Sequence, residues 1–305
     1  MNIKIPDRFS DNFGEPINYL LNILISINDF NPKEICFDFS GSKFINPFVI
    51  GGIVAISNKL AEEGKKIDFV FAKNSMNTLN YFGTIHFPLG FNFDKMSSEE
   101  MNAQLESYHS KTFIPLVLFP ASQNNIESTL RENVLSAINT ILKKQLNLTG
   151  NILEAIYYMI DELTNNIADH SESKKGILFA QFYPTKNYMD VCIADFGKGI
   201  KQTYLDSGKA NPGSHEEAME LAIKGQSTKN QAVSRGFGIS TSRKMLTEGL
   251  RGKFFLCSGN ALFYQNFEKQ EIIALPEAAC FKGCIVALRI PTIQNNNFDF
   301  YKYTR

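Results

Sequence analysis

The chain contains 305 residues, of which 44% are hydrophobic and 20% are charged, so we expect one large or two ordinary folded domains and exclude an intrinsically disordered protein. Lys and Arg together number 31, as do Asp and Glu, so no net charge attracts nucleic acid or an anionic membrane. The five cysteines form no Cys-x-x-Cys pair, which argues against structural zinc and favours reduced thiols.

The first part of the chain has the pattern of a small α/β domain. We expect a helix over Pro16–Ile27, a half-buried strand over Ile35–Phe39 and a second strand over Ile67–Phe71. Between the two strands, Asn46-Pro47 is a favourable start for a helix. Strand, helix and strand with short links predict a βαβ-like unit in a small mixed sheet.

A polar stretch, residues 96–111, is expected to connect this unit to a second domain. A strand follows at Phe113–Phe119, where Pro115 favours an edge position because proline lacks a backbone N–H. We expect the second domain to be a two-layer α/β sandwich with helices on one side and antiparallel strands on the other. Its other helices are expected over Ile126–Leu146, around Glu162, over Glu216–Ile223 and from Ile239, and its other strands over Gly176–Phe182, Met189–Ala194, Gly252–Cys257, Ala261–Phe267 and Gly283–Ile290.

The helix around Glu162 carries two different faces. Apolar residues between Ile156 and Ile167 follow the three- and four-residue spacing of a buried face. Glu162, Asn166 and His170 follow one another at intervals of four, so we expect them to point into one space. An Asn oxygen is a suitable magnesium ligand, and a carboxylate one turn away can activate water or a hydroxyl group. A solvated polar helix face would give the same pattern.

The segment Asp195-Phe-Gly-Lys-Gly directly follows a predicted strand. The Asp195 carboxylate can accept a hydrogen bond from the amino group of adenine. Gly197 and Gly199 permit the tight turn and close backbone approach that a flat base requires. An ordinary Asp-Gly turn is the alternative interpretation.

Two later segments contain groups that suit phosphate. Lys224–Lys229 offers lysine and hydroxyl side chains, although a flexible solvated loop has the same composition. Gly236 and Gly238 precede a helix whose free N–H groups can hold an anion, although a pair of glycines at a helix start needs no ligand.

Taken in this order, the motifs resemble the nucleotide-binding domain shared by DNA gyrase, heat-shock chaperone ATPases, histidine kinases and MutL-type mismatch-repair proteins. These are the GHKL or histidine-kinase-like ATPases, which have the Bergerat fold. The resemblance covers residues 112–292 and implies binding of ATP and Mg²⁺, with Glu162 as the general base, Asn166 as the magnesium ligand and Asp195 holding adenine. It implies these further nucleotide-binding residues: Asp169, Gly197, Gly199, Ser227, Thr228, Lys229, Arg235, Gly236, Phe237, Gly238 and Gly283.

One position departs from the family pattern. The family often has Thr directly after the last of these glycines, with its hydroxyl near adenine. This chain has Cys284 there, and a thiol is a weak hydrogen-bond group. The resemblance therefore does not decide whether Cys284 contacts adenine.

Within the family, Asp161–Ser171 looks most like the corresponding stretch of anti-sigma serine kinases. Histidine kinases usually lack the glutamate and carry their phosphoacceptor histidine on a preceding helical hairpin, which this sequence does not predict. The chain also ends too soon for the transducer domain that gyrase-type and MutL-type members carry. Phe37–Ile50 resembles the STAS domain of anti-sigma-factor antagonists, although the turn Asn46-Pro47-Phe48 has no hydroxyl to phosphorylate. Any small α/β domain is the alternative.

The resemblances imply a STAS-like domain over residues 1–95, a GHKL domain over residues 112–292 and a tail over residues 293–305 that is loose or held by a partner. The function they imply is an ATP-binding regulatory protein, of the anti-sigma or serine-kinase-like kind, that signals through protein partners. A lid over residues 200–235 would be ordered by ATP. A nucleotide-switched ATPase in stress or defence, without protein phosphorylation, and an ATP-binding module without turnover are the alternatives.

The expected setting is the cytoplasm, because the N-terminus has no signal-peptide pattern and the longest apolar runs, such as Phe113–Pro120, are too short to span a bilayer. We expect neither a nucleic-acid nor a membrane partner, and a homodimer is compatible with the sequence.

Overall fold

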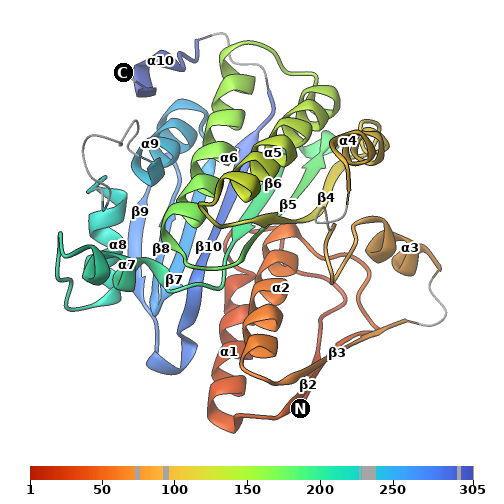
Figure 1. The fold of residues 1–305 in the computed structure, drawn as a ribbon, viewed down its shortest axis with the longest axis vertical. Helices are drawn as coiled ribbons and strands as arrows, with labels where there is room; N and C mark the ends of the chain where they lie inside the picture. The colour runs from red at the N-terminus through yellow and green to blue at the C-terminus, as the bar shows by residue number, and fades with distance from the viewer. Residues whose placement is uncertain (73–75, 92–95, 227, 229–237, 294–296, 305) are drawn as a thin grey trace.

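The computed structural model describes residues 1–72, 76–91, 96–226, 228, 238–293 and 297–304 (Figure 1). The protein belongs to the mixed α/β class, as predicted, and its strands form two sheets. A three-stranded sheet has the order β1-β2-β3, and a seven-stranded sheet has the order β4-β5-β6-β10-β7-β8-β9. No helix in the described part of the chain combines the length and the apolarity that a membrane span requires.

The small sheet contains the predicted strands and one short strand that the sequence did not reveal. All of its strands are parallel, whereas a mixed sheet was expected. The helix between the second and third strands begins where the sequence predicts, because the side-chain oxygen of Asn46 accepts a hydrogen bond from Val49 N at 3.0 Å. The elements are β1 (Asn2–Lys4), α1 (Ile17–Phe30), β2 (Glu34–Phe39), α2 (Pro47–Glu62), β3 (Lys66–Phe71) and α3 (Met76–Thr84).

The polar connector contains helix α4 (Ser98–Glu106). A capping box starts it, in which Ser97 and Glu100 each bond the backbone N–H of the other. Met101 and Leu105 on its inner side are buried in the hydrophobic core of the C-terminal half. The connector is therefore part of the packed structure.

The large sheet is antiparallel throughout, and β4 lies at its edge, as Pro115 predicts. The edge strand at the other side, β9, was not predicted, because its five residues are largely exposed and lack a clear apolar face. The strands are β4 (Phe113–Pro120), β5 (Lys175–Tyr183), β6 (Tyr188–Ala194), β7 (Lys253–Gly259), β8 (Ala261–Gln265), β9 (Gln270–Ala274) and β10 (Phe281–Pro291).

The helices of the C-terminal half include one that the sequence did not predict, α7, which begins directly after the Asp195 turn. A π-helical turn, Met245–Gly249, follows α9. The helices are α5 (Asn125–Leu146), α6 (Asn151–His170), α7 (Gly199–Ser207), α8 (His215–Ile223), α9 (Gly238–Lys244) and α10 (Tyr301–Thr304).

The large sheet is covered on both faces (Figure 1). Side chains alternate along each strand, so that Val191 and Ile193 of β6 face α5 and α6, while Cys192 and Ala194 face α1 and α2. Helices α1 and α2 lie between the two sheets, and their apolar residues join both sheets in one core. The N-terminal unit is therefore packed against the back of the sheet that carries Asp195.

The C-terminal residues were expected to be loose or held by a partner, and that expectation is wrong for Asn297–Thr304. Phe298 is buried, and its carbonyl oxygen accepts a hydrogen bond from Asn151 Nδ2 at 3.1 Å. The segment packs on its own chain because its aromatic side chains find an apolar surface beside α6 and α9.

Candidate functional site

A cavity of about 320 Å³ lies between α6, α7 and the start of α9, above the large sheet. This volume is within the range of pockets that hold small molecules, roughly 300 to 1,000 Å³. Its floor is apolar, because Ile193, Leu256 and Val286 project into it from β6, β7 and β10. Polar side chains from the C-terminal half of α6 form one wall, so the cavity is suited to a ligand with one flat apolar part and one polar part.

Glu162, Asn166 and His170 all line this cavity, as their spacing on one helix predicts. The side-chain nitrogen Nδ2 of Asn166 is buried and has no hydrogen-bond partner in the described structure. Leaving a buried polar group unpaired costs about 1–3 kcal/mol. An amide in this position is therefore available to a bound group, to which rotation about its last side-chain bond can present either its oxygen or its nitrogen.

Asp195 lies at the base of the cavity, directly after β6, and only 2% of its surface is exposed. Its Oδ1 accepts a hydrogen bond from the backbone N–H of Gly197 at 2.8 Å. Burial raises the pKa of the carboxyl group to about 7, although hydrogen bonds from the backbone of Gly197 and Cys284 oppose the shift. The carboxyl group is thus poised to change its charge near neutral pH.

Two of the three predicted glycines around Asp195 lie against the protein's own backbone. A Cβ at Gly197 would lie 1.9 Å from the backbone oxygen of Ser171, and one at Gly283 would lie 2.4 Å from the backbone oxygen of Asp195. The close approach at these two positions is therefore to the protein's own backbone, and neither glycine lines the cavity. Gly199 does line it, with φ +76° in the left-handed region that favours glycine.

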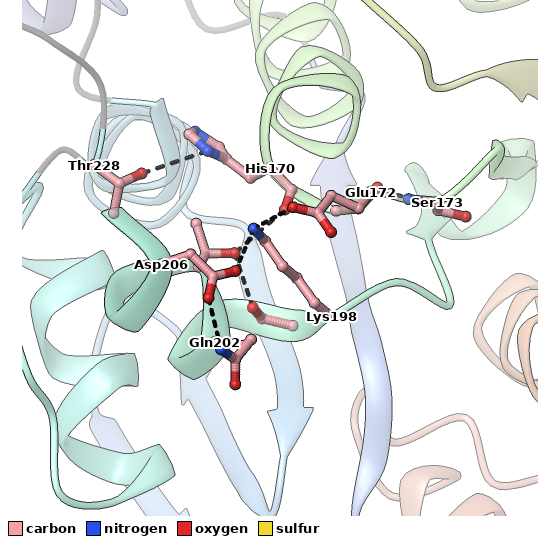
Figure 2. A network of polar contacts seen from close by, with 10 residues as sticks. His170, Glu172, Ser173, Lys198, Gln202, Asp206 and Thr228 are labelled. Carbon is pink, nitrogen blue, oxygen red and sulfur yellow. Dashed lines mark hydrogen bonds and ion pairs between the residues drawn. The ribbon is translucent and has the colours of Figure 1, made fainter. Parts of the chain in front are cut away.

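A network of charged and polar side chains joins the end of α6 to α7 (Figure 2). Lys198 Nζ lies 2.8 Å from Glu172 Oε1 and 2.7 Å from Asp206 Oδ2. His170 Nδ1 lies 3.4 Å from Thr228 Oγ1, which places that hydroxyl at the cavity wall. Because Lys198 already forms ion pairs with both carboxylates, its charge is not available to a ligand in this arrangement.

The lining residues that the structure describes are rich in carboxylates. Glu162, Asp169 and Asp195 all line the cavity, whereas no Lys or Arg does so within the described part of the chain. A polyphosphate would meet repulsion here without a divalent cation. No cluster of three His, Cys, Asp or Glu side chains suited to a metal occurs among the described residues, so a cation here would need ligands from the bound molecule and from water.

Cys284 lines the cavity, at the position where the resemblance raised a question. Its thiol lies 3.4 Å from Ser258 Oγ, which itself donates to Gly283 O at 2.8 Å and accepts from Ile200 N at 3.0 Å. Ser258 thereby fixes the start of α7 and accepts a hydrogen bond from the Cys284 thiol.

The structure brings together most of the predicted site residues that it describes. Asp169, Thr228 and Gly238 join the residues above in lining the cavity. The other predicted positions, Ser227, Lys229, Arg235, Gly236 and Phe237, lie outside the described residues. The sequence interpretation missed the wall contributed by α7, namely Ile200, Thr203 and Tyr204, although their helical spacing after Gly199 was a usable signal.

Comparison with known proteins adds no relative. No protein-family model, no curated protein and no solved structure matched the chain. The function is therefore inferred from the motifs and from the cavity that they form.

Proposed function

We propose that the protein binds Mg-ATP in this cavity and acts as an ATP-binding regulatory protein of the GHKL class, with anti-sigma or serine-kinase-like signalling to protein partners. The observation that carries the proposal is the convergence of Glu162 and Asn166 from α6 with Asp195 from the end of β6 over one apolar floor. These three residues are separated by up to 33 positions in the sequence and carry the three motif roles.

The chemistry of the lining residues fits the two parts of a nucleotide. The apolar floor suits the face of a purine, and the buried carboxyl of Asp195 suits the amino group at its edge. The amide of Asn166, whose Nδ2 has no partner in the described structure, can turn its oxygen toward a magnesium ion that keeps water and phosphate as its other ligands. Such an ion would offset the carboxylates of Glu162 and Asp169 that otherwise disfavour phosphate.

Glu162 is the residue that we assign to proton transfer. It lies one helical turn before Asn166 and lines the same cavity. A carboxylate at this position can take the proton of a water molecule or of a serine hydroxyl on a partner. If Glu162 activates water, the protein is an ATPase, and if it activates a serine hydroxyl, the protein is a protein kinase. If Glu162 activates neither, the protein is an ATP-binding module.

The N-terminal unit is proposed to be STAS-like and to receive the signal of a partner or of a second copy. Helices α1 and α2 already face the large sheet, so a partner would meet the other side of the small sheet. Signals at that unit have a short path to the cavity, since α2 packs against β6, which leads into Asp195.

The test is incubation of the purified protein with γ-labelled ATP and Mg²⁺, measuring bound nucleotide, released phosphate and label on protein. We expect binding that requires Mg²⁺, and we expect Glu162→Gln to retain binding while it abolishes phosphate release or transfer. Glu154→Gln is the matched control, because Glu154 is an exposed residue in the first turn of the same helix. No binding by the unaltered protein would reject the proposed function.

A further inference from the structure

The C-terminal segment Asn297–Thr304 contacts the helix that borders the cavity. Phe298 is only 5% exposed, and its ring stacks on that of Tyr303 with centroids 6.1 Å apart. A Cβ at Gly249 would lie 2.6 Å from the Phe298 ring and 3.1 Å from the Tyr303 ring. The two rings therefore rest on the backbone of Gly249, where only a glycine leaves room for them.

Gly249 ends the helical run that begins at the cavity. This run starts with Gly238, where a Cβ would lie 3.3 Å from Asn166 Nδ2, and continues through α9 into the π-helical turn Met245–Gly249. The wider turn is closed by a hydrogen bond from Leu250 N to Met245 O at 3.0 Å. Single π-helical turns are often found at functional sites. A displacement at Gly249 would be carried along this short helix to Gly238.

The same segment also contacts α6. The rings of Phe300 and Tyr158 meet edge to face with centroids 5.8 Å apart. Tyr158 lies one turn before Glu162 on α6, which packs against α9, while burial and then the charge of Glu162 raise the pKa of its hydroxyl to about 12. The C-terminal segment thus lies against both α6, which carries Glu162 and Asn166, and α9, which begins at Gly238.

We infer that Asn297–Thr304 is a strap that holds α9 against α6, and that release of the strap opens the cavity on the side of Gly238. In its effect on nucleotide, this inference rests on the proposed function. The strap regulates exchange of the bound molecule, because α9 must move away from Asn166 for the cavity to widen on this side. Removing the strap therefore increases both the local opening of α9 and the rate of nucleotide release.

The test compares Phe298→Ala with Tyr301→Ala as the matched control, since the Tyr301 ring lies in the same segment but is 55% exposed. The first measurement is amide hydrogen exchange in α9 without nucleotide, and the second is the dissociation rate of N-methylanthraniloyl-ATP with Mg²⁺. We expect Phe298→Ala to increase both rates about tenfold or more, and Tyr301→Ala to leave both within about twofold. If Phe298→Ala does not fold, Gly249→Ala replaces it, because the added methyl group displaces the two rings.

If a folded Phe298→Ala protein shows unchanged amide hydrogen exchange in α9, the inference that the segment acts as a strap is wrong. The inference is also wrong if exchange in α9 is faster with no change in the release of the analogue. If the unaltered protein binds no analogue, the proposed function fails. The exchange of α9 then decides alone whether the segment restrains that helix.

Discussion

Asp195 responds to pH in the direction opposite to that of an acidic residue with an ion-pair partner. Burial raises the pKa of its carboxyl group to about 7 in the folded protein, whereas an unfolded chain has an Asp pKa of about 3.9. Between these values the native state holds the proton more tightly, so the free energy of unfolding falls as pH rises. Above pH about 7 the ionised, buried Asp195 lowers the free energy of unfolding by its full amount. That cost is on the order of 4 kcal/mol at most, since one pKa unit corresponds to about 1.4 kcal/mol.

We therefore expect Asp195→Asn to abolish ATP binding and yet to stabilise the protein without nucleotide at pH 8. The gain should shrink toward pH 4, where the carboxyl group is protonated in the folded protein and about half protonated in the unfolded chain. Denaturant unfolding at several pH values measures it. Equal stability of the two proteins at pH 8 would show that burial of the ionised Asp195 carboxyl group does not destabilise the protein.

The same carboxyl group predicts a pH dependence of ligand affinity. An amino group that donates to Asp195 favours its ionised form, so the affinity for Mg-ATP should weaken as pH falls below about 7, by up to about tenfold per pH unit. Titration calorimetry at pH 6 and pH 8 measures this. An affinity that does not change over this range would argue against a contact between the base and Asp195.

Substitution of Gly197 tests whether a glycine is needed there for packing against the backbone or for ligand binding. Because a Cβ there would lie 1.9 Å from a backbone atom of Ser171, Gly197→Ala should destabilise the protein without nucleotide by about 1–3 kcal/mol or more. Thermal unfolding measures the effect, with Gly83→Ala as a control, since nothing lies within 4 Å of a Cβ at that position. A Gly197→Ala protein of normal stability that fails only in ligand binding would favour the role first expected from the sequence.

At the scale of elements, the sequence predicted those with a strong local signal. The helix around Glu162 has a continuous apolar stripe, and β6 has apolar residues on both faces because both faces are covered. The sequence did not reveal β9, which is held by pairing with β8, or α7, whose start is fixed by Ser258 from a distant strand. These elements depend on contacts that only the folded chain brings together.

In the candidate site, too, the sequence predicted the features that depend on local pattern and not those that depend on distant contacts. Helix periodicity placed Glu162 and Asn166 on one wall, and the strand pattern placed Asp195 at a strand end, because both are local properties. That Asp195 lies in the same site was implied only by the family resemblance. The sequence did not predict that Gly197 and Gly283 lie against the protein's own backbone, since a sequence cannot show which atoms a glycine faces. The pairing of Lys198 with Asp206 depends on α7, which was itself not predicted.

Helix α2 packs on the large sheet through a glycine. A Cβ at Gly51 would lie 2.4 Å from the sulfur of Cys192 on β6. Gly51→Ala should therefore lower the free energy of unfolding by about 1–3 kcal/mol, even though alanine favours a helix. Chemical denaturation measures the effect, and Gly41→Ala, with nothing within 4 Å of its Cβ, is the control.

Pairing the change with Cys192→Ala tests the cause. Removing the sulfur leaves space for the new methyl group, so the double variant should be more stable than the sum of the single effects predicts, by about 0.5 kcal/mol or more. Strict additivity of the two substitutions would mean that the contact between α2 and β6 is not the source of the loss.

At the scale of the whole molecule, the two sheets share the apolar residues of α1 and α2. Phe37 and Phe39 face these helices from the small sheet, and Phe179 and Phe255 face them from the large sheet. A domain that merely docks buries a modest and rather polar surface, whereas this interface has the character of a protein core. The two halves are therefore expected to depend on each other for stability.

Cleavage between the halves tests this dependence. A protease site inserted at the exposed residues Ser110 and Lys111 would divide the chain between α4 and β4 without removing any packed side chain. We expect the two pieces to stay together in gel filtration after complete cleavage and to separate only in denaturant, because separation would expose the apolar back of the large sheet to water. Two independently folded pieces that part under native conditions would show instead that the N-terminal unit is a removable module, and that any signal it receives must pass through a weaker contact than the shared core.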